Sequence, residues 1–265
     1  MQELTSLRHA SYVNLRALLL GGLLGYGFWY VAHHADQFLV IVTGMAGLVL
    51  LGTLWTTQFS FEKKYRLNYM IVPVVLYSGS LFFFLLLKNQ TYQIIFSVGI
   101  AALYIFLFRA FAELREHPTP ERKKSVTQAL DIVVALTMFV SFATLHELYF
   151  FFSWRLYGLI IAGVVLTMVL LYATYWHNRV MTLRAWFFVV LGGLLIGEYL
   201  WALSFLPSGY LTTALLAVVG LFLYYTITVA SLKGMLRQRV VMQHLMAAGV
   251  ISVIALVSSR WTPLL

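Results

Sequence analysis

Long apolar segments alternate with short polar segments along the whole chain, and this pattern predicts transmembrane helices. A helix needs about 20 apolar residues to cross the hydrocarbon core of a bilayer, which is about 30 Å thick. Nine segments reach this length, the ninth least clearly because Gln243 and His244 interrupt its start. The predicted spans are 15–33, 38–56, 69–87, 93–112, 124–145, 155–176, 185–206, 211–231 and 241–259. We therefore expect an all-α, polytopic transmembrane helix bundle of eight to ten spans, with nine the best count.

The segments between these spans are too short to form a soluble domain, so we expect a single integral membrane domain over residues 1–265. The first four spans and the next four show no internal sequence repeat. The polar segment 1–14 carries Arg8, as the start of a signal peptide would. The apolar run that follows is long and 31–35 is a poor cleavage site, so we expect the first span to stay in place.

The composition excludes several kinds of protein. The chain is 62% hydrophobic and 10% charged, whereas soluble globular domains are usually about 25% charged. It contains no cysteine, which rules out disulfides, thiolate zinc sites and a cysteine nucleophile. A phosphate-binding glycine loop of the Walker type is also missing, which argues against an ATP-driven pump on this chain alone. The sequence identifies no cofactor.

The basic residues lie mostly on one side of the predicted bundle. The net charge is +9, and all but three of the 18 lysines and arginines fall in alternate connections or at the span ends beside them. The exceptions are Lys88, Arg155 and Arg260. Because the short loops on the cytoplasmic side of a membrane protein carry most of its basic residues, we expect a cytoplasmic N-terminus. With nine spans, the C-terminus then lies outside.

This distribution of basic residues explains the net positive charge of the chain. Binding to nucleic acid is not needed to explain it. We expect an integral protein of a bacterial or archaeal plasma membrane, with the lipid bilayer as its partner and no nucleic-acid binding. The basic segments 62–66 and 121–124 are candidates for binding anionic lipid headgroups on the cytoplasmic side. The oligomeric state is left open.

Glu198 is the least expected residue of the seventh span. Counted within 185–206 it lies near the middle, where an acid costs about 2.5–3.5 kcal/mol. We therefore expect it to face protein or water, with Trp201 on the same face. Gly193 and Gly197 form a small-residue surface beside it, which favours close helix packing. A structural, hydrogen-bonded acid and a carboxylate coupled to proton or substrate movement remain two alternatives.

Asp131 is a second intramembrane acid, in the fifth span. The residues 119–121 form a helix start, with a capping hydroxyl, a proline and then an acid. The helix therefore begins before the membrane, and Asp131 lies shallower than Glu198, one turn after Gln128. A structural ion pair with Arg109, at the inner end of the fourth span, is the favoured interpretation.

The outer side collects the remaining candidates for chemistry. Three of the seven histidines and three of the nine acids lie in outer loops or approach them. They are His33, His34, Asp36, His146, Glu147 and Glu198. Imidazole and carboxylate can bind metals and transfer protons. No pair has the spacing of a helical ligand motif, so we assign no metal, and histidines that prefer the headgroup region explain the same pattern.

Three function classes remain. A small secondary transporter or permease, using Glu198 and Asp131 for coupling, fits the size and the number of spans best. A membrane-embedded enzyme that acts on a lipid or lipid-linked substrate at the outer leaflet would use the outer histidines and acids. A non-catalytic membrane subunit or assembly factor would use its polar residues only to hold helices together. Whether the chain is an enzyme is left open.

Overall fold

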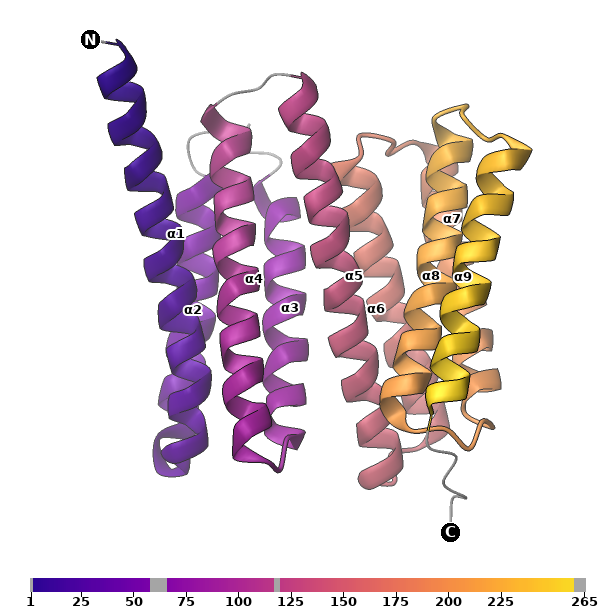
Figure 1. The fold of residues 1–265 in the computed structure, drawn as a ribbon. Helices are drawn as coiled ribbons and strands as arrows, with labels where there is room; N and C mark the ends of the chain where they lie inside the picture. Colours follow the sequence, from indigo (N-terminus) through magenta and orange to yellow (C-terminus); the bar gives the residue numbers. More distant parts are fainter. Residues whose placement is uncertain (1, 58–65, 117–119, 260–265) are drawn as a thin grey trace. The chain divides into compact units, whose positions relative to one another are not determined.

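The computed structural model describes residues 2–57, 66–116 and 120–259. Within these ranges the chain forms nine α-helices, one short 3-10 helix and no strand, which confirms the all-α prediction (Figure 1). The elements are α1 (Gln2–His33), η1 (Ala35–Gln37), α2 (Phe38–Thr57), α3 (Arg66–Leu86), α4 (Gln90–Glu116), α5 (Pro120–Phe151), α6 (Leu156–His177), α7 (Leu183–Leu203), α8 (Tyr210–Leu232) and α9 (Gln238–Ser258).

All nine helices in the described ranges are long and apolar enough to cross a membrane. This confirms the predicted count of nine, including the ninth helix, in which Val241–Ser258 is long and apolar enough. The helices close their backbone hydrogen bonds internally, which a chain in hydrocarbon requires. The orientation relative to the cytoplasm is not fixed by the fold and stays a prediction.

The fifth helix departs from the prediction at its far end. It begins at Pro120, as the capping signal predicted, but it continues to Phe151 instead of ending near 145. His146 and Glu147 therefore lie in a helix, and their assignment to a loop was wrong. The hydropathy count stopped at these two polar residues, whereas the apolar residues 148–151 carry the helix on for another turn.

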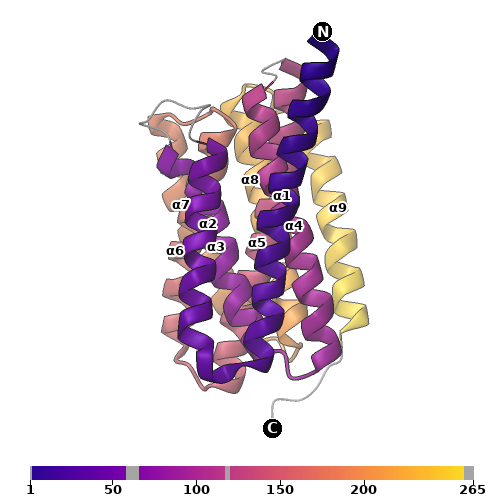
Figure 2. The same cartoon turned by 90° about the vertical axis from the view of Figure 1, so that its left-hand side faces the viewer.

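The chain divides into two compact units, Met1–Val133 and Val134–Leu265. In the first unit α1 packs most extensively against α4, and the two lie side by side in both views (Figure 2). Glycines of α1 allow this approach. A Cβ atom on Gly25 would lie 2.6 Å from the Cβ of Ala101, and one on Gly21 would meet Ile105. Small residues let the backbones of membrane helices approach closely. In lipid this close packing drives helix association through dispersion, because the hydrophobic effect does not act between helices there.

Two tyrosines tie the other helices of the first unit together. The Tyr77 hydroxyl of α3 donates to the Val42 carbonyl of α2 at 2.7 Å. The Tyr104 hydroxyl of α4 donates to the carbonyl of Pro73 in α3 at 2.8 Å, and both atoms are buried. A buried hydroxyl needs such a partner, so these bonds fix how the helices face one another.

In the second unit α7 packs against α6 and α8 through its glycines. A Cβ on Gly193 would lie 2.6 Å from Met168, one on Gly197 2.7 Å from Val164, and one on Gly192 2.5 Å from Tyr224. The predicted small-residue surface is thus a packing surface. The α6–α8 contact also contains a hydrogen bond of 2.6 Å between the Tyr175 and Thr228 hydroxyls.

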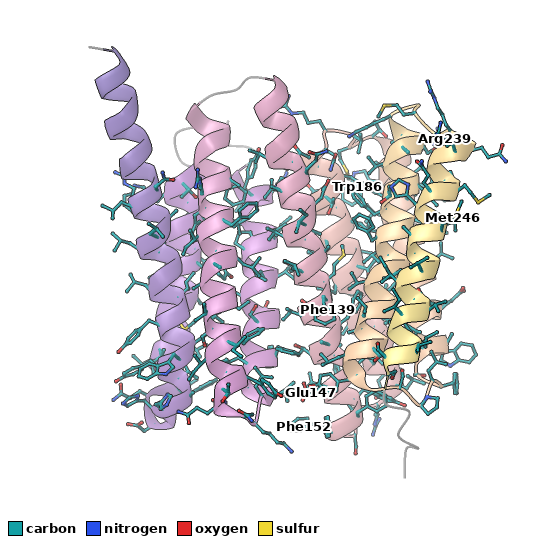
Figure 3. The ribbon with its side chains drawn as sticks, viewed as in Figure 1. Phe139, Glu147, Phe152, Trp186, Arg239 and Met246 are labelled. Atoms are coloured by element: carbon teal, nitrogen blue, oxygen red, sulfur yellow. The ribbon has the colours of Figure 1, made fainter. Side chains whose placement is uncertain are left out.

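Labelled residues mark the two ends of the second unit. Trp186 and Arg239 lie toward one end of this unit, and Glu147 lies toward the other (Figure 3).

The helix α9 packs against α8 and leaves most of its apolar side chains exposed. Such a surface suits contact with lipid, because acyl chains are as apolar as these side chains.

Candidate functional site

Glu198 does not lie on the packed side of α7. Its side chain is exposed, and so are Trp201 at 52% and Leu194 at 55%. Within its own chain Glu198 therefore faces no packed helix, and the expectation that it faces protein or water stays a prediction. Side chains one turn apart on a helix share a face, and the glycines that pack on α6 occupy a different one.

The depth of Glu198 is also smaller than the sequence count indicated. The helix ends at Leu203, five residues after Glu198, so the acid lies about 7.5 Å from the helix end at 1.5 Å per residue. The predicted span had included residues up to 206. A carboxyl at this depth can extend toward the interface, which lowers its cost below the value at the bilayer centre.

The predicted pair of Asp131 and Arg109 stays a prediction. Arg109 is exposed on α4, and Asp131 is partly exposed on α5, twelfth in a helix that begins at Pro120. Gln128, one turn earlier, is exposed. The helix therefore starts well before Asp131, as expected. The prediction that Asp131 lies shallower than Glu198 was based on this early start.

The two histidines at the end of α1 are held by contacts with their own helix. The Nδ1 atom of His33 lies 2.9 Å from the Trp29 carbonyl, and its ring packs on the Trp29 ring with centroids 4.5 Å apart. His34 stacks on Tyr30 at 3.9 Å and 9°. Both histidines thus extend an aromatic surface at the end of α1. This geometry suits the headgroup region, where amphipathic rings accumulate.

The surroundings of these histidines are polar and partly open. His33 Nε2 lies 3.1 Å from the side-chain nitrogen of Gln90, a contact that sequence reasoning missed. Asp36 lies in η1 and is exposed. No group of three His, Asp or Glu side chains that could hold a metal occurs among the described residues.

His146 differs from the other candidates because it is fully buried, at 0% exposure. Its Nδ1 atom lies 2.9 Å from the carbonyl oxygen of Phe142, one turn earlier. A carbonyl only accepts, so Nδ1 carries the proton and the Nε2 atom of the neutral ring presents a lone pair. Within the described part of the chain this buried Nε2 atom has no hydrogen-bond partner.

The packing of α5 shows which way His146 faces. A Cβ on Gly163 of α6 would lie 3.8 Å from the Phe142 ring and closer still to Leu200 of α7. Since Phe142 and His146 are four residues apart, they share a helix face. The unpaired imidazole nitrogen therefore belongs to the side of α5 that packs toward α6.

Glu147 is buried at 6% exposure, and as the next residue along the helix it lies on a different face of α5 from His146. It shares that face with Phe151, whose ring meets the ring of Tyr210 at 6.2 Å. The carboxylate of Glu147 also interacts electrostatically with the Tyr210 hydroxyl. Glu147 thus lies beside the N-terminus of α8, where the helix dipole favours negative charge.

Two buried hydroxyl groups complete the polar region at the start of α8. The Ser208 and Thr213 hydroxyls lie 3.1 Å apart, and Thr213 also donates to the Gly209 carbonyl. Sequence reasoning singled out neither these hydroxyls nor Tyr210. The feature of the sequence that could have identified these residues is that they are polar side chains in a mostly apolar stretch. We call Glu147, Tyr210, Ser208 and Thr213 the α5–α8 polar cluster.

No family model matches the chain, and comparisons with curated proteins and with solved structures find no match. The nine apolar helices of the described ranges are those of a multi-pass integral membrane protein. The class therefore follows from the helices alone, and any particular activity has to be argued from the site.

Proposed function

We propose that the protein is a small secondary transporter whose proton-coupling groups are His146 and Glu147. The observation that supports this proposal is the buried Nε2 atom of His146, which has no hydrogen-bond partner in the described chain. A buried acceptor left unpaired costs about 1–3 kcal/mol. Ionisable residues inside membrane spans are costly and are retained at ion and proton pathways.

The chemistry of the pair suits reversible protonation. The Nδ1 contact to Phe142 holds the imidazole ring in one tautomer and leaves Nε2 as the atom that accepts a proton. The next residue, Glu147, supplies a second buried ionisable group on another face of the helix. Protonation would then shift the equilibrium between two conformations, as coupling requires.

This proposal moves the coupling role from Glu198 to α5. A coupling acid has to reach the transported species or its aqueous pathway, whereas Glu198 points away from the helices that pack on α7. Glu147 instead is buried and faces Tyr210 at the start of α8, so it lies inside the protein. The size and span count that favoured a transporter apply unchanged.

The test uses purified protein in proteoliposomes that contain a pH-sensitive dye. Pools of small solutes are added under an imposed proton gradient, and solute-dependent proton flux is recorded. We expect His146→Asn and Glu147→Gln to abolish the flux and Glu198→Gln to retain it. The proposal is wrong if the two α5 variants transport as the wild type does.

A second candidate function, that of a membrane subunit that assembles with a second copy, is favoured by the exposed face of α7. Glu198 and Trp201 lie one turn apart on this face amid apolar side chains. An indole N–H donates and a carboxylate accepts, so a copy related by two-fold symmetry could exchange both bonds. Isologous interfaces consist of such reciprocal pairs.

Cysteine cross-linking in the native membrane tests this second candidate, since the chain has no cysteine of its own. Leu194 lies on the Glu198 face, and Phe222 of α8 is an exposed control at 44%. Oxidation of Leu194→Cys should give disulfide-linked dimers, whereas Phe222→Cys should not. Equal dimer yields at both positions would exclude a specific α7 interface.

The hypothesis of a metal-dependent enzyme gains no support from the described residues, where no three ligating side chains gather. His33 and His34 instead contact the aromatic rings of their own helix. We therefore propose no reaction for this chain.

A further inference from the structure

One end of the second unit carries a positive charge that no acid balances. The connections between α6 and α7 and between α8 and α9 both lie at this end (Figure 1). The acids of residues 134–259 are Glu147 and Glu198. Glu147 lies toward the other end (Figure 3), and Glu198 lies about 21 Å along α7 from Arg184 at 1.5 Å per residue. The basic residues at this end, which we call the basic rim, are Arg179, Arg184, Lys233, Arg237 and Arg239.

Side-chain contacts bring the two connections of the basic rim together. The Lys233 ammonium at the end of α8 donates to the Asn178 side-chain oxygen at 3.0 Å, and Asn178 directly precedes Arg179. Arg184 of α7 lies 3.5 Å from the Ser231 hydroxyl of α8. The amide and the hydroxyl are neutral, so these contacts hold the positive charges close together without cancelling them.

Three arginines of the basic rim have free guanidinium groups. The side chains of Arg179, Arg237 and Arg239 are exposed. Within the described part of the chain none of them makes a hydrogen bond, an ion pair or a ring contact. All of their N–H groups are therefore available to a ligand outside the chain.

The backbone positions of these arginines argue against a purely structural role. Arg179 has a φ of 56° in the turn that ends α6, a conformation for which glycine is the usual residue. Arg237 is the N-cap residue of α9 and makes no side-chain cap hydrogen bond, and Arg239 lies in the first turn of that helix. The helix dipole opposes positive charge at this end of a helix. The charges therefore do not serve to stabilise the helix ends.

Exposed apolar side chains lie among the basic residues. Leu183, next to Arg184, is 88% exposed, and Met235 and Leu236 are exposed in the connection between α8 and α9. Trp186 is exposed one turn into α7, and tryptophan is common where headgroups meet hydrocarbon. A soluble acidic partner would leave these apolar groups in water. A membrane surface offers phosphates to the arginines and acyl chains to their apolar neighbours.

We propose that the basic rim binds the headgroups of anionic phospholipids. The guanidinium groups of Arg179, Arg237 and Arg239 bind the phosphates through their N–H groups, for which an arginine fork is well shaped. The exposed leucine and methionine side chains contact the acyl chains below. The surface is separate from the proposed transport function, because it includes neither His146 nor any residue of the α5–α8 polar cluster.

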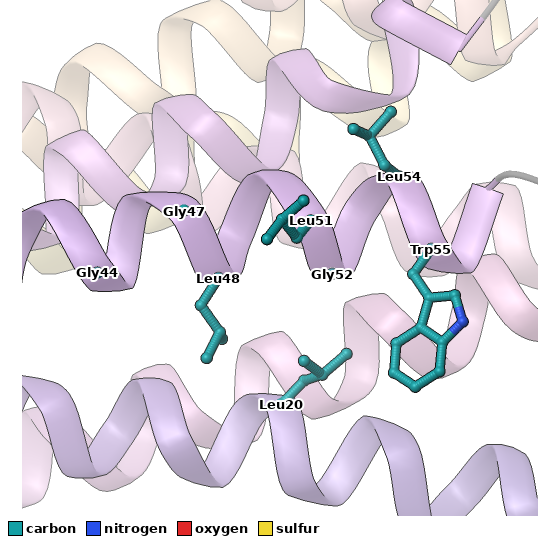
Figure 4. Close-up of a pocket in the computed structure, with 8 residues that line it drawn as sticks. All are labelled: Leu20, Gly44, Gly47, Leu48, Leu51, Gly52, Leu54 and Trp55. Carbon is teal, nitrogen blue, oxygen red and sulfur yellow. The ribbon is translucent and has the colours of Figure 1, made fainter.

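The test has to measure lipid composition at the basic rim itself. Acyl chains contact apolar surfaces whatever the headgroup is, and the chain has such a surface in the groove between α1 and α2, lined by Leu20, Leu48 and Trp55 (Figure 4). The total amount of lipid retained by the protein therefore does not test the proposal. The local preference for an anionic over a zwitterionic headgroup does.

A single fluorophore reports this preference, because the chain has no cysteine of its own. Met235→Cys places the fluorophore in the basic rim. Phe205→Cys is the matched control, since Phe205 is also exposed but lies in the connection between α7 and α8, and residues 185–232 contain no lysine or arginine. Each labelled protein is reconstituted into phosphatidylcholine vesicles with a small fraction of spin-labelled phosphatidylglycerol or spin-labelled phosphatidylcholine, which quench the fluorophore on contact.

We expect phosphatidylglycerol to quench at position 235 at least about fivefold more strongly than phosphatidylcholine, the effect of about one basic residue at an anionic surface. The two lipids should quench equally at position 205. Joint replacement of Arg179, Arg237 and Arg239 by glutamine should remove the preference at 235, whereas joint replacement by lysine should keep it. Arg155→Gln, which removes one charge at the start of α6, should leave it unchanged.

Two results would overturn the proposal. One is equal quenching by both lipids at position 235, or a preference there that survives the three glutamine substitutions. The other is binding of heparin, a soluble polyanion, to the basic rim in a form that phosphatidylglycerol vesicles do not displace, since this would assign the surface to a soluble partner. Circular dichroism checks that each variant remains helical.

Discussion

Replacing His146 with leucine should stabilise the protein while removing its proposed proton acceptor. The substitution loses the Nδ1 contact to Phe142, worth about 0.5–1.5 kcal/mol net. The Phe142 carbonyl keeps its helical partner, so no backbone group is orphaned. Removal of the buried, unpaired Nε2 atom recovers about 1–3 kcal/mol. The central values leave a net gain of about 1 kcal/mol.

A gain of this size corresponds to a rise in Tm of about 2–4 °C for a chain of this length. Tryptophan fluorescence during thermal unfolding in one detergent measures it, since the seven tryptophans report on the fold. Leu170→Ala calibrates the scale, because Leu170 is fully buried in the same unit and such truncations cost about 2–5 kcal/mol. A fall in Tm for His146→Leu comparable with that of Leu170→Ala would refute the reasoning. It would mean that Nε2 has a partner in the folded protein.

Three further predictions concern packing, hydrogen bonding and orientation. Gly25→Leu should lower the Tm, because its Cβ would lie 2.6 Å from Ala101 and overpacking costs about 1–3 kcal/mol; Gly22→Leu, in open space, should leave it unchanged. Tyr104→Phe should cost about 1 kcal/mol in unfolding free energy, because the buried hydrogen bond between α4 and α3 is lost; an unchanged free energy would show that this bond adds nothing to stability. A cysteine at Asn89 should react with an impermeant maleimide from outside intact cells, and labelling only after lysis would reverse the predicted topology.

The predicted helices agree with the structure because the bilayer imposes a simple rule. Every backbone group in hydrocarbon has to be paired, so an apolar segment of sufficient length becomes a helix whatever its neighbours are. This explains why the nine spans, and the start of α5 at Pro120, could be predicted from residue order alone. Helix ends are less constrained, because the interface tolerates polar side chains, and here α5 continued past the predicted limit.

The facing of side chains could not be predicted in the same way. A hydropathy count places Glu198 at a depth but does not say which side of α7 meets α6, since lipid and protein interior are both apolar. The glycines of α7 marked the packed side correctly, and Glu198 lies off it. Glu198 was assigned to the same side as these glycines only because it is close to them in the sequence.

By itself, then, the sequence determined the class of the protein, the number of membrane helices and the residue types available for chemistry. Only the tertiary structure decided that Glu198 is exposed, that His33 and His34 pack on their own helix, and that His146 is buried with one ring nitrogen unpaired. The physical reason is that helix formation in a membrane depends on local composition, whereas burial depends on which helices meet, and small residues far apart in the chain set those contacts.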